Sequence, residues 1–213
     1  YVSTWYSKGH QGTVLGIFGV GNVGAAITNF AAPMLMIALG WRGVAEVYAA
    51  CLLVMAIIFA IFAKNDPALK ARRESNTKHP SLAQQLAPLK NLQVWRFSLY
   101  YFFSFGAFVA LALWLPRYYI GAYGVTLKTA GMLSAIYALP ASIFRALGGW
   151  FSDKFGARAV MYWVFGVSVI CCFILSYPKT MYTIDGIRGQ LSFSFGIGLV
   201  TFVIVTFILG FFM

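Results

Sequence analysis

Long apolar segments constrain the fold of this chain more than any other feature. Short polar connections separate six mainly apolar runs, at about 11–41, 44–63, 97–116, 129–152, 159–177 and 191–213. About 20 apolar residues in a helix span the hydrocarbon core of a bilayer. A soluble domain could not solvate a sequence that is 61% hydrophobic and only 10% charged. We therefore expect an all-α integral membrane protein with six transmembrane helices, whose surroundings are a lipid bilayer.

The basic residues predict how the chain is oriented. If the N-terminus is cytoplasmic, the inside segments 1–12, 64–96 and 153–158 carry ten Lys and Arg residues, against five in the outside segments. Cytoplasmic loops of membrane proteins carry such an excess of positive charge. The net charge of +11 therefore indicates topology, and we expect no nucleic-acid partner.

One connection differs from the others in length and composition. Residues 64–96 are polar and basic and contain Pro80 and Pro88, which favours an exposed, partly flexible loop on the cytoplasmic side. It divides the chain into residues 1–63 with two spans and residues 97–213 with four. The chain starts without Met and stops inside an apolar run, so we expect a piece of a longer protein.

A glycine-rich motif, G-V-G-N-V-G at 19–24, matches the G-x-G-x-x-G pattern of dinucleotide-binding loops. That function needs a water-exposed strand–turn–helix unit, whereas this motif lies in an uncharged apolar run. On a helical wheel, Gly12, Gly16 and Gly19 form one stripe, and Gly21 and Gly24 lie on a nearly opposite face. Small residues on two faces predict close packing against two neighbouring helices.

Between these two faces runs a strip formed by Asn22, Ala26, Asn29 and Pro33. An Asn side chain facing hydrocarbon would lose its hydrogen bonds at a cost of several kcal/mol. We expect this strip to face protein or a polar cavity. Asn22 can then serve either as an interhelical hydrogen-bonding residue or as a binding residue.

Arg145 is the only charged residue deep within any of the six runs. An arginine near a bilayer centre costs about 2.5–3.5 kcal/mol on insertion scales, so a counter-charge or a function is expected for it. No Asp or Glu lies deep in a run. Pro140 should bend the same helix. Small and hydroxyl residues share the face of Arg145 and predict a cavity wall: Ser134, Ala138, Ala141, Ser142, Gly148, Gly149 and Ser152.

Arg145 and Asn22 are both displaced from the middle of their runs towards the cytoplasm, by roughly 6–7 Å at 1.5 Å per residue. The two side chains can therefore lie in one layer of the protein. A planar guanidinium matches a planar oxyanion in a bidentate manner. We expect a small-anion site formed by Arg145 and Asn22.

Cofactor ligands are scarce in the sequence. The histidines, His10 and His79, lie in predicted loops, and the three cysteines show no metal or disulfide spacing. We expect no metal site, no cofactor and no enzymatic activity.

The segment G-G-W-F-S-D-K-F-G-A-R, at 148–158, resembles the loop signature G-x-x-x-D-[RK]-x-G-x-[RK] of the Major Facilitator Superfamily. The residues in register are Gly149, Asp153, Lys154, Gly156 and Arg158. The resemblance implies a charged latch between helices that helps to set the equilibrium between inward-open and outward-open states. Asp153, Lys154 and Arg158 would carry that role.

Two further segments resemble the nitrate/nitrite porters of the NarK/NasA type. Q-G-T-V-L-G-I-F-G-V-G-N-V-G, at 11–24, is similar to the nitrate signature on their fifth helix, with Gly16, Gly19, Gly21 and Gly24 as its glycines. F-G-A-F-V-A-L-A-L-W-L-P-R-Y-Y, at 105–119, is similar to their seventh helix. The chain would then be helices five to ten of twelve.

The same resemblance implies how the anion is held. In these porters two arginines clamp the anion, with the signature Asn and aromatic side chains nearby. Arg145 matches the second arginine and Asn22 the Asn, and the first arginine would lie outside this chain. The expected function is secondary active transport of nitrate and/or nitrite by alternating access, in a multi-pass monomer of the cytoplasmic (inner) membrane.

Alternatives to this function remain open. A porter of the same fold for another small anion or a carboxylate fits a lone arginine. A membrane oxidoreductase would need haem, metal or nucleotide ligands, and a purely structural subunit would leave Arg145 unexplained. The coupling is open between proton symport and nitrate/nitrite exchange, with the similarity at 105–119 favouring uptake with protons as the coupling ion.

Overall fold

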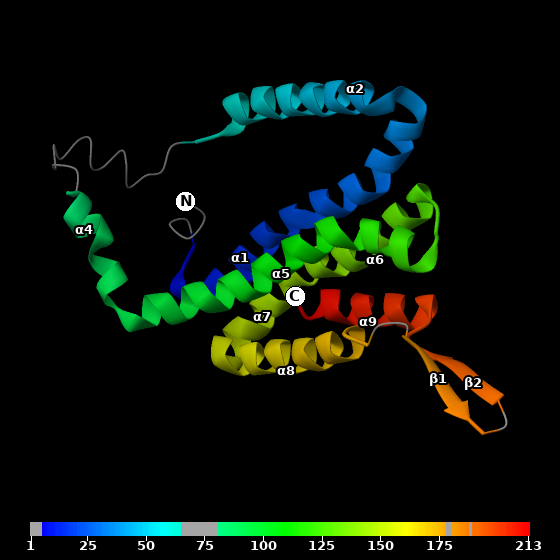
Figure 1. Cartoon of the computed structure of the whole chain (residues 1–213). Helices are drawn as coiled ribbons and strands as arrows, with labels where there is room; N and C mark the ends of the chain where they lie inside the picture. Colours follow the sequence, from blue (N-terminus) through cyan, green and yellow to red (C-terminus); the bar gives the residue numbers. More distant parts are fainter. Residues whose placement is uncertain (1–5, 65–80, 178–179, 188) are drawn as a thin grey trace.

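The computed structural model describes residues 6–64, 81–177, 180–187 and 189–213. After a 3-10 turn at Lys8–His10, the chain forms α1 (Gln11–Gly19), a 3-10 turn (Val20–Asn22) and α2 (Val23–Phe62), which follow one another without a loop. Gly40 interrupts α2 with φ of 69° and ψ of 176°. Glycine adopts this backbone conformation at little steric cost. Gly40 therefore separates two membrane-length segments close to the predicted boundary, and Figure 1 shows the second folding back over the first.

The next described segment begins with α4 (Leu82–Leu86) and a 3-10 turn (Ala87–Lys90), followed by α5 (Leu92–Tyr123). Ser81 and Gln84 form a reciprocal capping box at the start of α4. Asn91 caps α5, so this helix begins inside the predicted connection and runs beyond the predicted end at residue 116. The expected flexibility of the connection concerns mainly residues 65–80, which lie outside the described residues.

A single predicted span is divided into α6 (Leu127–Ile143) and α7 (Arg145–Phe155). The interruption lies at Phe144, one turn after Pro140, and the amide of Phe144 still donates to the Pro140 carbonyl over 3.0 Å. After α7, Gly156 makes a sharp turn with φ of 87°, and α8 (Ala157–Leu175) follows. The expected disturbance near Pro140 is therefore present, slightly further along the chain.

The last predicted span is wrong in its first part. Strands β1 (Thr180–Gly186) and β2 (Gly189–Phe195) form an antiparallel hairpin, and only α9 (Leu199–Phe211) is helical. The stretch L-S-F-S-F within β2 alternates apolar and polar residues, which is the period of a strand. The fold is otherwise helical. Four helical segments in the described residues are long and apolar enough to cross a membrane, and the first contains the break at Gly40.

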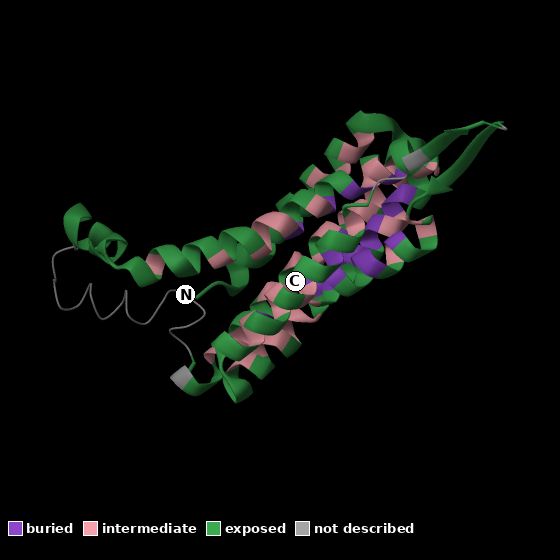
Figure 2. Ribbon diagram, turned by 60° about the horizontal axis from the view of Figure 1, so that its bottom comes forward, coloured by how far each residue is buried: buried purple, intermediate pink, exposed green. Residues whose placement is uncertain are grey.

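Helix α6 lies at the centre of the bundle, where it packs against α2, α5 and α9, while α1 packs against α7. Small residues on α6, such as Gly131 and Ala138, allow this close packing. Figure 2 shows that the buried residues concentrate in the half of the bundle nearer the hairpin. The outer faces of α5 and α8 and the second part of α2 expose large apolar side chains, as expected for a multi-pass membrane protein.

Candidate functional site

Arg145 is the first residue of α7, directly after the interruption at Phe144. Its Nε donates to the carbonyl of Ala141, one turn earlier, over 3.1 Å. The guanidinium carbon lies 5.4 Å and 5.1 Å from the ring centroids of Phe105 and Phe108 on α5. Cations within about 6 Å of an aromatic centroid are attracted by the ring. The arginine is thus held by one backbone hydrogen bond and two aromatic rings.

The terminal nitrogens of Arg145 remain available. A guanidinium carries five N–H donors, and within the described part of the chain the Nε is the one that makes a hydrogen bond. Across the same residues, Arg145 forms no ion pair with a carboxylate. The side chain is only partly buried. It therefore presents a planar pair of donors that can take an anionic ligand.

Asn22 is the last residue of the 3-10 turn between α1 and α2, and it is partly buried. Its side chain makes no hydrogen bond to any of the residues that the structure describes. A Cβ atom placed on Gly19, three residues before Asn22, would lie 3.0 Å from Cδ of Arg145. The fold thus brings Arg145 against the segment that ends at Asn22, although no hydrogen bond joins the two side chains.

The rest of the polar strip faces protein, as expected. Asn29 Nδ2 donates to the carbonyl of Ala112 on α5 over 3.2 Å, and Ala26 is buried. Pro33 and the backbone of Asn29 lie against Gly131 of α6. Asn29 therefore acts as an interhelical hydrogen-bonding residue, whereas Asn22 is left with its amide unengaged by the described residues.

The predicted cavity wall beside Arg145 is wrong for its α6 part. Ser134 and Ser142 are fully buried, and their hydroxyls donate to the carbonyls of Ala130 and Ala138 over 2.8 Å. Hydroxyls in helices often bond back to the preceding turn in this way. This face of α6 is buried against neighbouring helices of the described residues.

One glycine stripe forms a tight helix contact. A Cβ on Gly16 would lie 2.5 Å from the carbonyl oxygen of Arg145, and a Cβ on Gly149 would collide with the backbone of Gly12. The backbones of α1 and α7 can approach this closely only because glycine has no side chain. A Cβ added to Gly21 or Gly24 would meet no heavy atom of the described residues within 4 Å, so the second predicted contact has no counterpart there.

Asp153, near the end of α7, lies over the first turn of α1. Its carboxylate accepts hydrogen bonds from the amides of Gly12 and Thr13, over 2.9 and 2.7 Å, and from the Thr13 hydroxyl over 2.7 Å. The first amides of a helix lack partners within the helix and carry a partial positive charge. The carboxylate accepts hydrogen bonds from these amides, and its negative charge is attracted by their partial positive charge. It therefore ties α7 to α1 at this end of the bundle.

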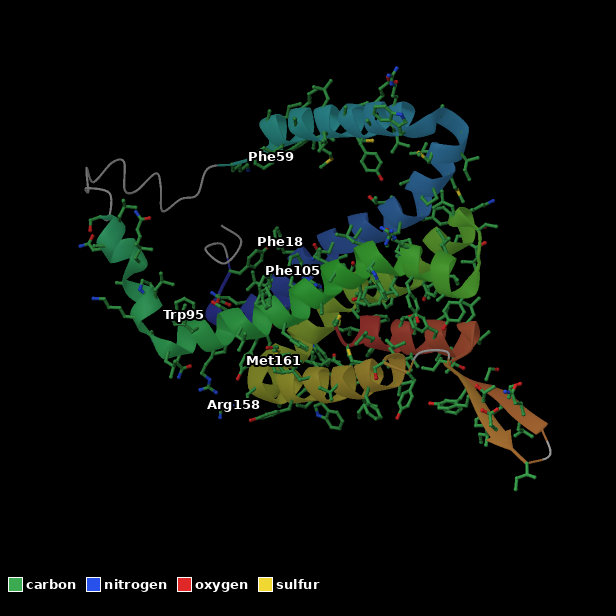
Figure 3. The ribbon with its side chains drawn as sticks, in the orientation of Figure 1. Phe18, Phe59, Trp95, Phe105, Arg158 and Met161 are labelled. Carbon is green, nitrogen blue, oxygen red and sulfur yellow. The ribbon has the colours of Figure 1, made fainter. Side chains whose placement is uncertain are left out.

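The other residues of the loop signature have different environments. Gly156 provides the positive φ that the turn into α8 requires. Lys154 Nζ lies 5.0 Å from the ring centroid of Trp150 and 5.4 Å from that of Phe155. Arg158 is exposed, and Figure 3 shows it at the start of α8, pointing away from the bundle.

Sequence reasoning missed three partners in this region. Phe105 and Phe108 lie on α5 next to Arg145, and Figure 3 labels Phe105 on its helix. Thr13 donates hydrogen bonds to the Asp153 carboxylate. The dense aromatic run at 102–108 was the available signal for the first two. No group of three or more His, Cys, Asp or Glu side chains that could hold a metal ion occurs in the described ranges.

Comparison with known proteins identifies relatives over the whole chain. The family model described as Major Facilitator Superfamily matches residues 1–213. The chain is 38% identical over 98% of its length to a probable nitrate/nitrite antiporter, NarK1, of Thermus thermophilus, and covers 48% of that protein. It is 32% identical over 92% of its length to a nitrite extrusion protein of Bacillus subtilis, covering 48% of it. A probable nitrate transporter, NarT, of Staphylococcus epidermidis is 33% identical over 93% of the chain, which covers 50% of it.

The chain therefore spans about half the length of the curated relatives that it matches. No solved structure gives a significant match.

Proposed function

The chain belongs to the Major Facilitator Superfamily, and on this premise we propose that the protein carrying it is a secondary transporter of nitrate, nitrite or both. Transport proceeds by alternating access across the cytoplasmic membrane. Arg145 binds the anion, and the Asn22 amide donates to it from the neighbouring segment. The names of three relatives refer to nitrate or nitrite and support this substrate class. A transport function also agrees with the expectation that the chain is not an enzyme.

The proposal rests on the hydrogen-bond donors of Arg145 that have no partner among the described residues. Its Nε is bonded to Ala141, its ring neighbours are apolar, and its terminal nitrogens are unengaged by the described residues. Charge-assisted bidentate hydrogen bonds from a guanidinium to a planar oxyanion are among the strong hydrogen bonds in proteins. In a membrane protein, such an anion also offsets the cost of the buried charge.

Anion binding can drive the conformational change if the two states bind the anion with different affinity. The contact between α1 and α7 joins the helix that precedes the turn ending at Asn22 to the helix that begins at Arg145. Asp153 ties the first turn of α1 to α7, and we assign it the part of the latch, with Lys154 and Arg158 at the same loop. Release of this contact would let α1 and α7 move relative to each other when the anion neutralises Arg145.

We also propose how the chain is divided between the two halves of the transporter. Residues 1–63 form the end of one half of the transporter and residues 97–213 the beginning of the other, with residues 64–96 as the cytoplasmic connection. Helix α5 extends into that connection, because it starts at Leu92. The protein acts as a monomer. Coupling is by proton symport or by nitrate/nitrite exchange, and the antiporter name of one relative supports including exchange in the test.

The test measures nitrate uptake into liposomes that contain the complete protein. Uptake is compared for the wild type, Arg145→Lys and Arg117→Lys, which alters an exposed arginine on α5. Lysine keeps the charge but lacks the planar fork, so we expect uptake to collapse in Arg145→Lys and to persist in Arg117→Lys. Normal nitrate uptake by an Arg145→Ala protein would contradict the assignment.

The same liposomes decide the coupling and the substrate. Uptake that follows an imposed pH gradient indicates proton symport, and uptake only into liposomes preloaded with nitrite indicates exchange. A guanidinium recognises charge better than chemical identity, so formate and small carboxylates are added as competitors. If they are transported and nitrate is not, the protein is a porter for another small anion.

A further inference from the structure

The β-hairpin between α8 and α9 has two chemically different faces. In the register of β1 and β2, Tyr182 pairs with Phe193 and Ile184 pairs with Leu191. Successive residues of a strand point to opposite faces, so these four side chains share one face, together with Phe195. The rings of Tyr182 and Phe193 stack, with centroids 5.5 Å apart.

The other face of the hairpin is polar. Here Thr183 pairs with Ser192 and Asp185 pairs with Gln190, and Ser194 lies on the same side of β2. This division into an apolar and a polar face holds for every described side chain from Tyr182 to Asp185 and from Gln190 to Phe195. The hairpin is therefore amphipathic, which a solvent-exposed loop would not need to be.

Nothing in the described part of the chain covers the apolar face. Its five side chains are between 47% (Phe193) and 65% (Leu191) exposed, and Ile187, at the tip, is fully exposed. Figure 1 shows the hairpin projecting away from the helices. An isolated two-stranded hairpin is marginally stable in water and needs a hydrophobic surface against its apolar face. The hairpin therefore needs an apolar partner.

The position of the hairpin points to the partner. β1 follows the end of α8. Ile197, two residues after β2 and two before α9, is tied to the end of α5 by a hydrogen bond of 3.0 Å from Tyr123 Oη to its carbonyl. The base of the hairpin thus lies level with the ends of membrane-spanning helices. A strand rises about 3.3 Å per residue, so the seven-residue strands are roughly 20 Å long.

The apolar face is also continuous with the exposed apolar surface of a membrane-length helix. Phe173, on the exposed side of α8, contacts Tyr177 edge-on at 5.5 Å, and Tyr177 contacts Phe195 of the hairpin at 6.4 Å. Phe173 is 63% exposed within a membrane span. Aromatic side chains favour the membrane–water interface. One run of rings therefore leads from the hydrocarbon-facing surface of α8 to the hairpin.

We propose that the hairpin is a membrane-surface anchor, with the apolar face formed by Tyr182, Ile184, Leu191, Phe193 and Phe195 inserted into the interfacial region of the bilayer. It lies flat and does not span, because its two strand edges carry unpaired backbone groups that hydrocarbon does not tolerate. The polar face with Asp185 remains in water. This inference depends on the membrane location of the helices and is independent of the transported anion.

The test uses the complete protein in liposomes, with Cys51 and Cys172 changed to Ser and Cys171 to Ala. Single cysteines are placed at Ile184 or Leu191 on the apolar face and, as matched controls, at their neighbours Thr183 or Ser192 on the polar face. Each carries a nitroxide label. Electron paramagnetic resonance then measures collision rates with oxygen, which concentrates in the bilayer, and with a water-soluble nickel chelate.

We expect labels at 184 and 191 to collide several-fold more with oxygen than with the nickel chelate, and labels at 183 and 192 to show the reverse. Equal access of the nickel chelate to both faces would overturn the proposal, because the hairpin would then stand in water. Low collision rates with both reagents at 184 and 191 would also overturn it, since protein would then cover the face. Monodisperse elution of each variant before reconstitution controls for folding.

Discussion

At the residue scale, Arg145 combines an anchored Nε with unengaged terminal nitrogens. The hydrogen bond to Ala141 and the rings of Phe105 and Phe108 restrict the guanidinium without neutralising it. Such restriction lowers the entropy that is lost when a ligand binds. In the proposed anion site, the aromatic rings would therefore raise affinity by fixing the position of the arginine.

Replacing Phe105 with Leu tests this role. The substitution keeps an apolar side chain but removes the ring, so the guanidinium loses a contact worth about 0.5–2 kcal/mol. We expect the KM for the anion to rise several-fold, up to about 30-fold, with little change in thermal stability. Phe102→Leu, at a position 73% exposed on the same helix, is the matched control. Equal KM values in the two variants would contradict the role of Phe105.

At the element scale, α1 and α7 are in close backbone contact. Glycines from both helices allow their backbones to touch, and Asp153 joins the end of one to the start of the other. Asn22 ends the 3-10 turn that follows α1, and Arg145 is the first residue of α7. Movement between α1 and α7 therefore changes the separation of Asn22 and Arg145.

The Gly16 contact predicts a sharp effect of a single methyl group. A Cβ at this position would lie 2.5 Å from the Arg145 carbonyl oxygen, so Gly16→Ala should force the helices apart and destabilise the protein by about 1–3 kcal/mol. The measurement is the thermal unfolding midpoint together with nitrate uptake. Gly166→Ala on α8, where the added methyl group meets open space, should lower neither. An unchanged Gly16→Ala protein would show that α1 and α7 are not in close contact.

The helix cap of Asp153 predicts a local change in amide exchange. Asparagine at this position keeps an acceptor oxygen but loses the charge, so the amides of Gly12 and Thr13 should exchange faster in hydrogen–deuterium exchange of the complete protein. Asp185→Asn, on the hairpin, should leave the exchange of α1 unchanged. Identical exchange in Asp153→Asn and the wild type would remove the latch contact from the mechanism.

At the scale of the whole molecule, the bundle is organised around α6 and leaves broad apolar surfaces exposed. The second part of α2 and the face with Gly21 and Gly24 have few contacts in the described residues. The chain covers about half of the length of its curated relatives. The basic residues in 1–12, 64–96 and 153–158 predict an orientation with these segments on the cytoplasmic side.

This orientation predicts which positions are reachable from outside the cell. In a cysteine-free background, Ile187→Cys at the tip of the hairpin should react with a membrane-impermeant maleimide in intact cells. Ala157→Cys, at the first residue of α8, should react only after the cells are permeabilised. Both positions are exposed, so burial does not explain a difference. The opposite pattern would invert the proposed topology.

The sequence by itself determined the membrane class and most of the spans, and it singled out Arg145 as the one charged residue deep within an apolar run. Hydropathy over about 20 residues is a local property, and a charge in an apolar run is visible without a partner. The loop signature marked Gly156, whereas its turn, with φ of 87°, became visible only in the structure. Hydropathy averaging concealed the hairpin, because alternation in L-S-F-S-F has the same mean hydropathy as a mixed helix.

Only the tertiary structure decided which groups meet. Asp153 accepts hydrogen bonds from the first amides of α1, and the glycine stripe with Gly16 packs against α7. The rings of Phe105 and Phe108 lie beside Arg145. The hydroxyls of Ser134 and Ser142 look like a polar wall in the sequence but are satisfied within their own helix. Spacing along one helix defines a face, whereas the partner of that face depends on how distant elements pack, and that is set by the whole bundle.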